Sequence, residues 1–126
     1  MDASVAVEYL LRTAMGRAVA PMLDSAMLLA PELLDAEVLA VLRRAVLEKR
    51  LGEPRARAAI DDLRHWNVRR LGHAALLLDA WALRANVTAY DALYLAAARR
   101  TGATVLTADG PLARAPATGV VVQNVR

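Results

Sequence analysis

Helical segments alternate along the chain with short apolar runs, and this alternation is the feature that most restricts the possible folds. Four apolar runs are too short for helices and predict strands, at residues 26–29, 67–71, 104–107 and 119–125. Segments with helical periodicity or helix-start signals predict helices, at residues 4–13, 17–25, 32–51, 54–66, 74–85 and 88–102. Strands separated by helices are typical of an α/β fold with a parallel sheet, whose functional sites form at the carboxyl ends of the strands.

Glycine and proline residues indicate where these elements begin and end. Gly16 predicts a break between the first two helices, and Pro31 fits the start of the third, where its missing N–H costs nothing. Gly52 predicts the end of that third helix. Residues 109–111 (Asp-Gly-Pro) have the composition of a turn.

The composition predicts one soluble domain that spans residues 1–126. The chain is 57% hydrophobic, which is enough for a real core, and it has no internal repeat or linker. It has no cysteine, so disulfides, thiolate zinc sites and cysteine nucleophiles are excluded. No apolar run approaches the roughly 20 residues that span a bilayer, and Asp2 and Glu8 lie where a signal peptide would be apolar. We therefore expect a cytoplasmic protein that does not contact a membrane.

The charge balance is a weak pointer to nucleic acid. The formal net charge is +3, and arginine accounts for all but one of the 16 basic residues. Arginine favours planar contacts with phosphates and carboxylates, which would suit RNA or an acidic partner. A GC-rich genome explains the same bias equally well.

Asp91 occupies an unusual position at the start of the helix expected at 88–102. Thr88 can cap this helix, with Asp91 in the acidic position of a capping box. Leu95 and Ala98 follow Asp91 at i+4 and i+7, which puts the carboxylate on the buried face. An unpaired buried charge is costly, so something must meet it there. A capping role alone would explain an isolated Asp91.

Three further acids lie near the ends of predicted elements among apolar neighbours. Asp109 follows the strand at 104–107, Glu37 lies at the margin of the apolar stripe of helix 32–51, and Asp2 precedes the first helix. With Asp91 they form a set that we call the acidic quartet: Asp2, Glu37, Asp91 and Asp109. Converging carboxylates repel one another unless a cation relieves them. Oxygen ligands suit Mg²⁺ or Mn²⁺ rather than Zn²⁺, and such a site supports phosphodiester hydrolysis.

The segments around the quartet resemble the four signature motifs of PIN-domain nucleases. They are Asp-Ala-Ser-Val at 2–5, Leu-Asp-Ala-Glu-Val-Leu at 34–39, Tyr-Asp-Ala-Leu-Tyr-Leu-Ala at 90–96 and Leu-Thr-Ala-Asp at 106–109. Their order, their spacing and the chain length are most similar to the VapC toxins of bacterial toxin–antitoxin pairs. The resemblance covers nearly the whole chain.

The resemblance implies a fold, an activity and partners. The implied fold is the PIN-like three-layer α/β fold, a short parallel sheet of about five strands flanked by helices. Its first strand would be truncated here, because only Met1 precedes Asp2. The implied activity is that of a Mg²⁺- or Mn²⁺-dependent endoribonuclease, a hydrolase acting on RNA. Such toxins are usually homodimers, silenced by a cognate VapB-type antitoxin.

The resemblance also implies a role for each site residue. Asp2, Asp91 and Asp109 would hold the metal directly or through water. Glu37 would orient the attacking water or help to bind a second ion, and attack in line would leave a 5′-phosphate and a 3′-hydroxyl. Ser4 and Thr107 match hydroxyl positions often found beside the quartet.

Three alternatives remain open at this point. The chain could be a non-catalytic PIN-like module that binds RNA or protein, or a PIN nuclease of RNA processing that has no antitoxin. A receiver-like signalling domain also clusters acids around Mg²⁺, but it needs a lysine on a late strand, and the single lysine of this chain, Lys49, lies at the end of a helix.

Two apolar segments and two single residues complete the sequence predictions. The apolar residues of 5–11 and 19–29 are either ordinary core or a groove for a partner. His73 reads as a surface or loop residue and Tyr94 as a packing residue.

Overall fold

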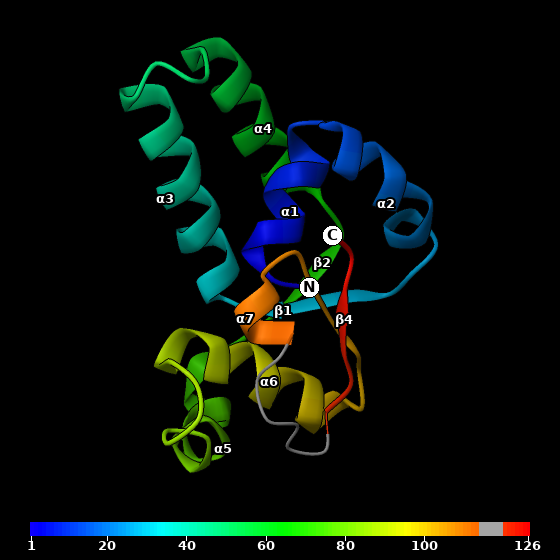
Figure 1. Ribbon diagram of the computed structural model, residues 1–126, viewed down its shortest axis with the longest axis vertical. Helices are drawn as coiled ribbons and strands as arrows, with labels where there is room; N and C mark the ends of the chain where they lie inside the picture. The colour runs from blue at the N-terminus through cyan, green and yellow to red at the C-terminus, as the bar shows by residue number, and fades with distance from the viewer. Residues whose placement is uncertain (114–119) are drawn as a thin grey trace.

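The computed structural model describes residues 1–113 and 120–126 (Figure 1). Its helices in chain order are α1 (Ala3–Leu10), α2 (Ala14–Asp24), α3 (Leu33–Leu47), α4 (Glu53–His65), the 3₁₀ helix η1 (His73–Leu76), α5 (Leu77–Ala82), α6 (Ala89–Thr101) and α7 (Gly110–Ala113). Its strands are β1 (Leu28–Pro31), β2 (Val68–Leu71), β3 (Val105–Thr107) and β4 (Val122–Asn124). Position 119, where the last strand was expected to begin, lies outside the described residues.

The strands pair in parallel, as the alternation of helices and strands predicts. β1 pairs with β2, with Leu28 opposite Val68. β3 pairs with β4, with Val105 opposite Val122. The α/β fold class is therefore confirmed. The described strands form two parallel pairs rather than one continuous sheet.

Met1 and Asp2 lie between the two strand pairs. The Met1 amino group is 3.4 Å from the carbonyl oxygen of Leu29 in β1. The backbone N–H of Asp2 donates to the carbonyl of Leu106 in β3 over 3.0 Å. A cavity of about 370 Å³ beside Met1 is lined by both strands. Met1 and Asp2 are not part of a strand, but their backbone hydrogen bonds connect β1 and β3 without completing a sheet.

The boundaries of the first two helices differ from those expected at Gly16. The chain breaks instead at Arg12, which has a left-handed φ of 54°. Thr13 then caps α2 by accepting a hydrogen bond from the backbone N–H of Gly16 over 3.1 Å. Gly16 lies inside α2, where it allows a close approach to α1, so its role is packing rather than breaking the chain.

The ends of α3 also differ from the prediction. Pro31 is the buried last residue of β1 rather than the start of a helix. α3 ends at Leu47 because Lys49 turns the chain with a left-handed φ of 59°, and Gly52 instead precedes α4 as its N-cap.

Two later segments form other kinds of secondary structure than the sequence predicts. Residues 110–113, expected to begin as a turn, form the short helix α7. The expected helix at 74–85 divides into η1 and α5.

The main core lies where α1 packs against α2, α3 and α4, and α6 connects it to smaller clusters. Val5 and Leu10 of α1 are buried, so the first apolar segment is core, whereas in 19–29 Val19 and Leu23 are buried but Met22 and Met27 are exposed. α6 buries residues on several of its sides and contacts both β1 and β3, so it packs against both strand pairs. In the described part of the chain, no helix is both long enough and apolar enough to cross a bilayer.

Candidate functional site

Asp2 is a buried carboxylate held by hydrogen bonds from two parts of the chain. As the N-cap of α1, its Oδ1 accepts from the backbone N–H of Ser4 over 3.1 Å and from that of Val5 over 3.4 Å. The Ser4 hydroxyl donates to the same oxygen over 2.6 Å. Thr107, at the end of β3, donates its hydroxyl to Oδ2 over 2.5 Å. These donors, together with the positive end of the helix dipole, compensate for the burial of the charge.

Ser4 and Thr107 connect the start of α1 to the carboxyl end of β3. The backbone N–H of Ala108 donates to the Ser4 hydroxyl over 2.9 Å. The backbone N–H of Asp109 donates to the Thr107 hydroxyl, also over 2.9 Å. Each hydroxyl therefore accepts one hydrogen bond and donates another to Asp2, which fixes the chain just before Asp109. The structure brings both predicted hydroxyls to the quartet.

Glu37 projects from the second turn of α3 and is half-buried. Its Oε1 accepts a hydrogen bond from the phenol of Tyr94 in α6 over 2.7 Å. Burial raises the pKa of Glu37, and the nearby charges of Asp2 and Asp91 raise it further. The hydrogen bond from Tyr94 lowers the pKa of Glu37 and opposes part of this rise. Glu37 is thus electrostatically coupled to two other acids of the quartet.

Asp91 lies in the first turn of α6, as the capping pattern predicts. Thr88 caps the helix by accepting from the backbone N–H of Asp91 over 3.1 Å. The Asp91 side chain is half-buried. Burial raises its pKa, followed by the charges of Asp109 and Asp2, while the Thr88 hydroxyl acts in the opposite direction. Its surroundings therefore disfavour the charged carboxylate, which a capping role alone would not require.

Among the described residues, the quartet consists of mutually repelling carboxylates without basic partners. In the described residues, none of its members forms an ion pair with Arg, Lys or His. The same described residues contain no group of three or more His, Cys, Asp or Glu side chains gathered closely enough to hold a metal ion. The quartet is thus an open arrangement, coupled by charge, in which the donor atoms are all oxygens.

Two residues that the sequence analysis set aside contribute to this region. Tyr94 packs in the core as predicted, and its phenol also contacts Glu37. His73 was interpreted as a surface or loop residue, but its Nε2 accepts from the backbone N–H of Leu33 over 3.0 Å and caps α3. The position of Tyr94, three residues after Asp91 on the same helix, was the available signal. No comparable local signal marked His73, because its partner is 40 residues away.

Arg70 in β2 forms an ion pair and several hydrogen bonds that connect β2 to α3 and α4. The Arg70 guanidinium binds Asp35 of α3 over 2.9 Å and donates to the carbonyls of Leu63, Trp66 and Val68. It therefore holds α3 beside β2.

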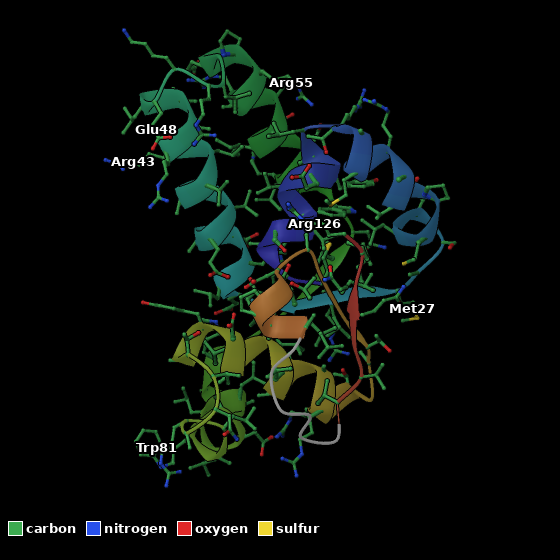
Figure 2. The ribbon with its side chains drawn as sticks, in the orientation of Figure 1. Met27, Arg43, Glu48, Arg55, Trp81 and Arg126 are labelled. Carbon is green, nitrogen blue, oxygen red and sulfur yellow. The ribbon has the colours of Figure 1, made fainter. Side chains whose placement is uncertain are left out.

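Trp81 is an exposed aromatic residue on α5. Figure 2 shows its side chain on the outer side of this helix, pointing away from the molecule, and 65% of its surface is exposed.

Comparison with known proteins identifies relatives over most of the chain. The family model described as PIN domain matches residues 1–117. Ribonuclease VapC1 of Mycobacterium tuberculosis is 47% identical over 98 residues, which are 77% of this chain and 74% of that protein. Ribonuclease VapC3 of the same species is 39% identical over 116 residues, 91% of this chain and 85% of the relative. VapC ribonuclease Mb0985 of Mycobacterium bovis is 35% identical over 109 residues, 86% of this chain and 84% of the relative.

Proposed function

Because the chain belongs to the PIN-domain family and, within it, to the VapC-type ribonucleases, we propose that it is a metal-dependent endoribonuclease of the cytoplasm. It hydrolyses RNA phosphodiester bonds and is the toxin of a toxin–antitoxin pair. The observation that carries this proposal is the arrangement around Asp2. A buried carboxylate, fixed by Ser4 and Thr107, is coupled by charge to Glu37 and Asp91.

The donor atoms of the quartet fit Mg²⁺ or Mn²⁺. They are carboxylate oxygens, which hard divalent cations prefer, and their mutual repulsion favours a bound cation. Because the acids are too far apart for three of them to bind one ion directly, Asp2, Asp91 and Asp109 would hold the ion at least partly through water, and Glu37 would lie beside it. When bound, the ion makes a water molecule more acidic and neutralises charge on the scissile phosphate.

The side chains of this protein would position the water and receive its proton. Glu37 has one oxygen bonded to Tyr94, and the second can accept a hydrogen bond from the attacking water. Burial raises the pKa of Glu37, which makes it a better proton acceptor than an ordinary glutamate. Ser4 and Thr107 keep Asp2 in one orientation during the reaction. In-line attack leaves a 5′-phosphate and a 3′-hydroxyl.

An apolar surface on α3 and α4 supports a protein partner. Leu39, Val41 and Leu47 of α3 are exposed. A groove of about 550 Å³ between the two helices is lined mainly by apolar side chains, including Leu39 and Ile60. A groove of this kind accommodates an amphipathic helix. We assign it to a VapB-type antitoxin, and we retain the expectation of a homodimer.

The test is cleavage of total bacterial RNA by purified protein free of antitoxin. Mg²⁺ or Mn²⁺ should yield discrete fragments with 5′-phosphates, and EDTA should abolish them. Asp91→Asn should lower cleavage by roughly 100-fold or more while the protein stays folded. Asp62→Asn, an exposed acid on α4, is the matched control and should cleave normally.

Two results would overturn the proposal. Cleavage that persists in EDTA and in Asp91→Asn would remove the quartet from the chemistry. A folded wild-type protein that neither cleaves RNA nor binds divalent ions would favour the non-catalytic binding module.

A further inference from the structure

Tyr94 is a buried tyrosine whose hydroxyl lies among the acids of the quartet. Only 4% of the residue is exposed. Its phenol donates to Oε1 of Glu37 over 2.7 Å, and the backbone of Ala3, next to Asp2, lies beside the phenol oxygen of Tyr94. One hydroxyl therefore links the start of α1, the second turn of α3 and the first turns of α6. An apolar residue would fill the space equally well, so packing alone does not explain the hydroxyl.

The hydrogen bond restricts a side chain that would otherwise move freely. Glu37 is only half-buried and has three rotatable side-chain bonds, so without a partner it can turn towards solvent. In the described structure, Tyr94 is the side chain that hydrogen-bonds to Glu37. Because the phenol occupies Oε1, it leaves Oε2 for a water molecule. A carboxylate that activates water must be held in such a geometry, since a displacement of about 1 Å can cost roughly 100-fold in rate.

We propose that Tyr94 is a positioning residue that holds Glu37 towards the space shared with Asp2 and Asp91. The inference rests on the proposed function, because it assigns a supporting role within the same site. Tyr94 acts through Glu37 and contacts neither the RNA nor the ion. Its removal should therefore reduce the rate of the chemical step and leave RNA binding unchanged.

The first test is the kinetics of Tyr94→Phe on a defined RNA fragment cleaved by the wild type. We expect kcat to fall by roughly 10- to 100-fold, with KM for RNA unchanged. Tyr9→Phe is the matched control, because Tyr9 also donates its phenol to a carboxylate, that of Asp24, over 2.6 Å. The control should retain the wild-type kcat. Thermal unfolding of each variant identifies a temperature at which all are folded.

A double-mutant cycle separates positioning from a general structural role. Glu37→Ala alone should lower kcat at least as much as Tyr94→Phe. In the Glu37→Ala background, the further change Tyr94→Phe should have no effect, because its target is already absent. A structural role would lower kcat in both backgrounds. The inference would be overturned if the loss of kcat in the double variant equalled the product of the two single losses. It would also be overturned if Glu37→Ala had the kcat of the wild type.

A spectroscopic test needs no activity at all. In metal-free protein with ¹³C-labelled glutamate, the side-chain carboxyl signal of Glu37 is identified by its loss in Glu37→Ala. This signal should shift in Tyr94→Phe and stay in place in Tyr9→Phe. If the wild type does not cleave RNA, the proposed function fails while this test still decides whether Tyr94 holds Glu37. If the wild type cleaves and Tyr94→Phe has a normal kcat, only the positioning role fails.

Discussion

Asp2 has two roles, because it caps α1 and also belongs to the acidic quartet. Capping requires a short polar side chain directly before the helix, and the site requires a carboxylate at the same place. Both needs are met because the Asp2 oxygens accept from backbone N–H groups of α1 and from the hydroxyls of Ser4 and Thr107. Replacing Asp2 would therefore change helix stability and site charge together, which makes Asp91 the better residue for testing charge alone.

Asp91→Asn should raise the free energy of unfolding of the metal-free protein at neutral pH. Burial first, and then Asp109 and Asp2, raise the native-state pKa of Asp91 above the usual 3.8. The native state therefore holds this proton more tightly than the unfolded state does. The resulting stabilisation is fully present below pH 3.8 and is lost as the pH rises through the native-state pKa. The increase in the free energy of unfolding caused by Asp91→Asn should be at most about 1 kcal/mol, because the Asp91 side chain is only half-buried.

Urea denaturation in EDTA between about pH 4 and pH 8 measures this difference. The gap between Asp91→Asn and the wild type should widen with pH and then level off. Asp62→Asn, an exposed control, should show no such gap. A wild type that is the more stable protein at pH 8 would contradict the repulsion inferred here.

At the scale of elements, the crossing of α1 and α2 depends on one residue without a side chain. A Cβ at Gly16 would lie 1.9 Å from the carbonyl oxygen of Glu8 and 2.5 Å from its carbonyl carbon. Both atoms belong to the backbone of α1, so they cannot move aside alone. This contact sets the distance between the two helices, and α1 in turn places Asp2 and Ser4.

Gly16→Ala should therefore lower the free energy of unfolding by on the order of 3 kcal/mol, since it forces α1 and α2 apart. Gly52→Ala is the control, because its nearest neighbour would be Cδ of Pro54 at 3.9 Å and its φ of −73° suits alanine. The control should lower stability by only about 1 kcal/mol or less, which reflects the poorer capping of α4 by alanine. Equal urea midpoints for the two variants would show that α1 and α2 can separate without cost.

At the scale of the whole molecule, the quartet is assembled from four different parts of the fold. Asp2 precedes α1, Glu37 lies in α3, Asp91 begins α6 and Asp109 follows β3. Unfolding would separate these acids, so the unfolded chain should have little affinity for a divalent ion. Ion binding should consequently be linked to global stability.

Mg²⁺ or Mn²⁺ should raise the melting temperature of the wild type, and EDTA should reverse the effect. An ion present at 100 times its dissociation constant adds about 2.7 kcal/mol when it binds only the native state. Asp109→Asn should reduce this shift, and KCl at equal ionic strength should not reproduce it. A melting temperature that does not change on addition of either ion at millimolar concentrations would contradict the proposed metal site.

Much of the fold and of the candidate site could be predicted because the signals are local. Thr88 and Asp91 are three residues apart, so the sequence alone indicates the start of α6, and Gly102 ends it with a left-handed φ of 70°. The acids of the quartet were found from their places at the starts and ends of such elements. Their presence in one region follows from the parallel strands and helices, while their catalytic roles stay predictions.

The α/β class and the parallel pairing of the strands follow from local patterns in the sequence, and the same patterns single out the four acids as a predicted site. The division of the described strands into two pairs, and the contacts of Tyr94 with Glu37 and of Thr107 with Asp2, arise only when the chain folds in three dimensions. These last partners are 57 and 105 residues apart. Caps and turns depend on residues only a few positions apart in the sequence. The contacts of Tyr94 and Thr107 depend instead on how whole helices and strands pack, which the local spacing of residues does not specify.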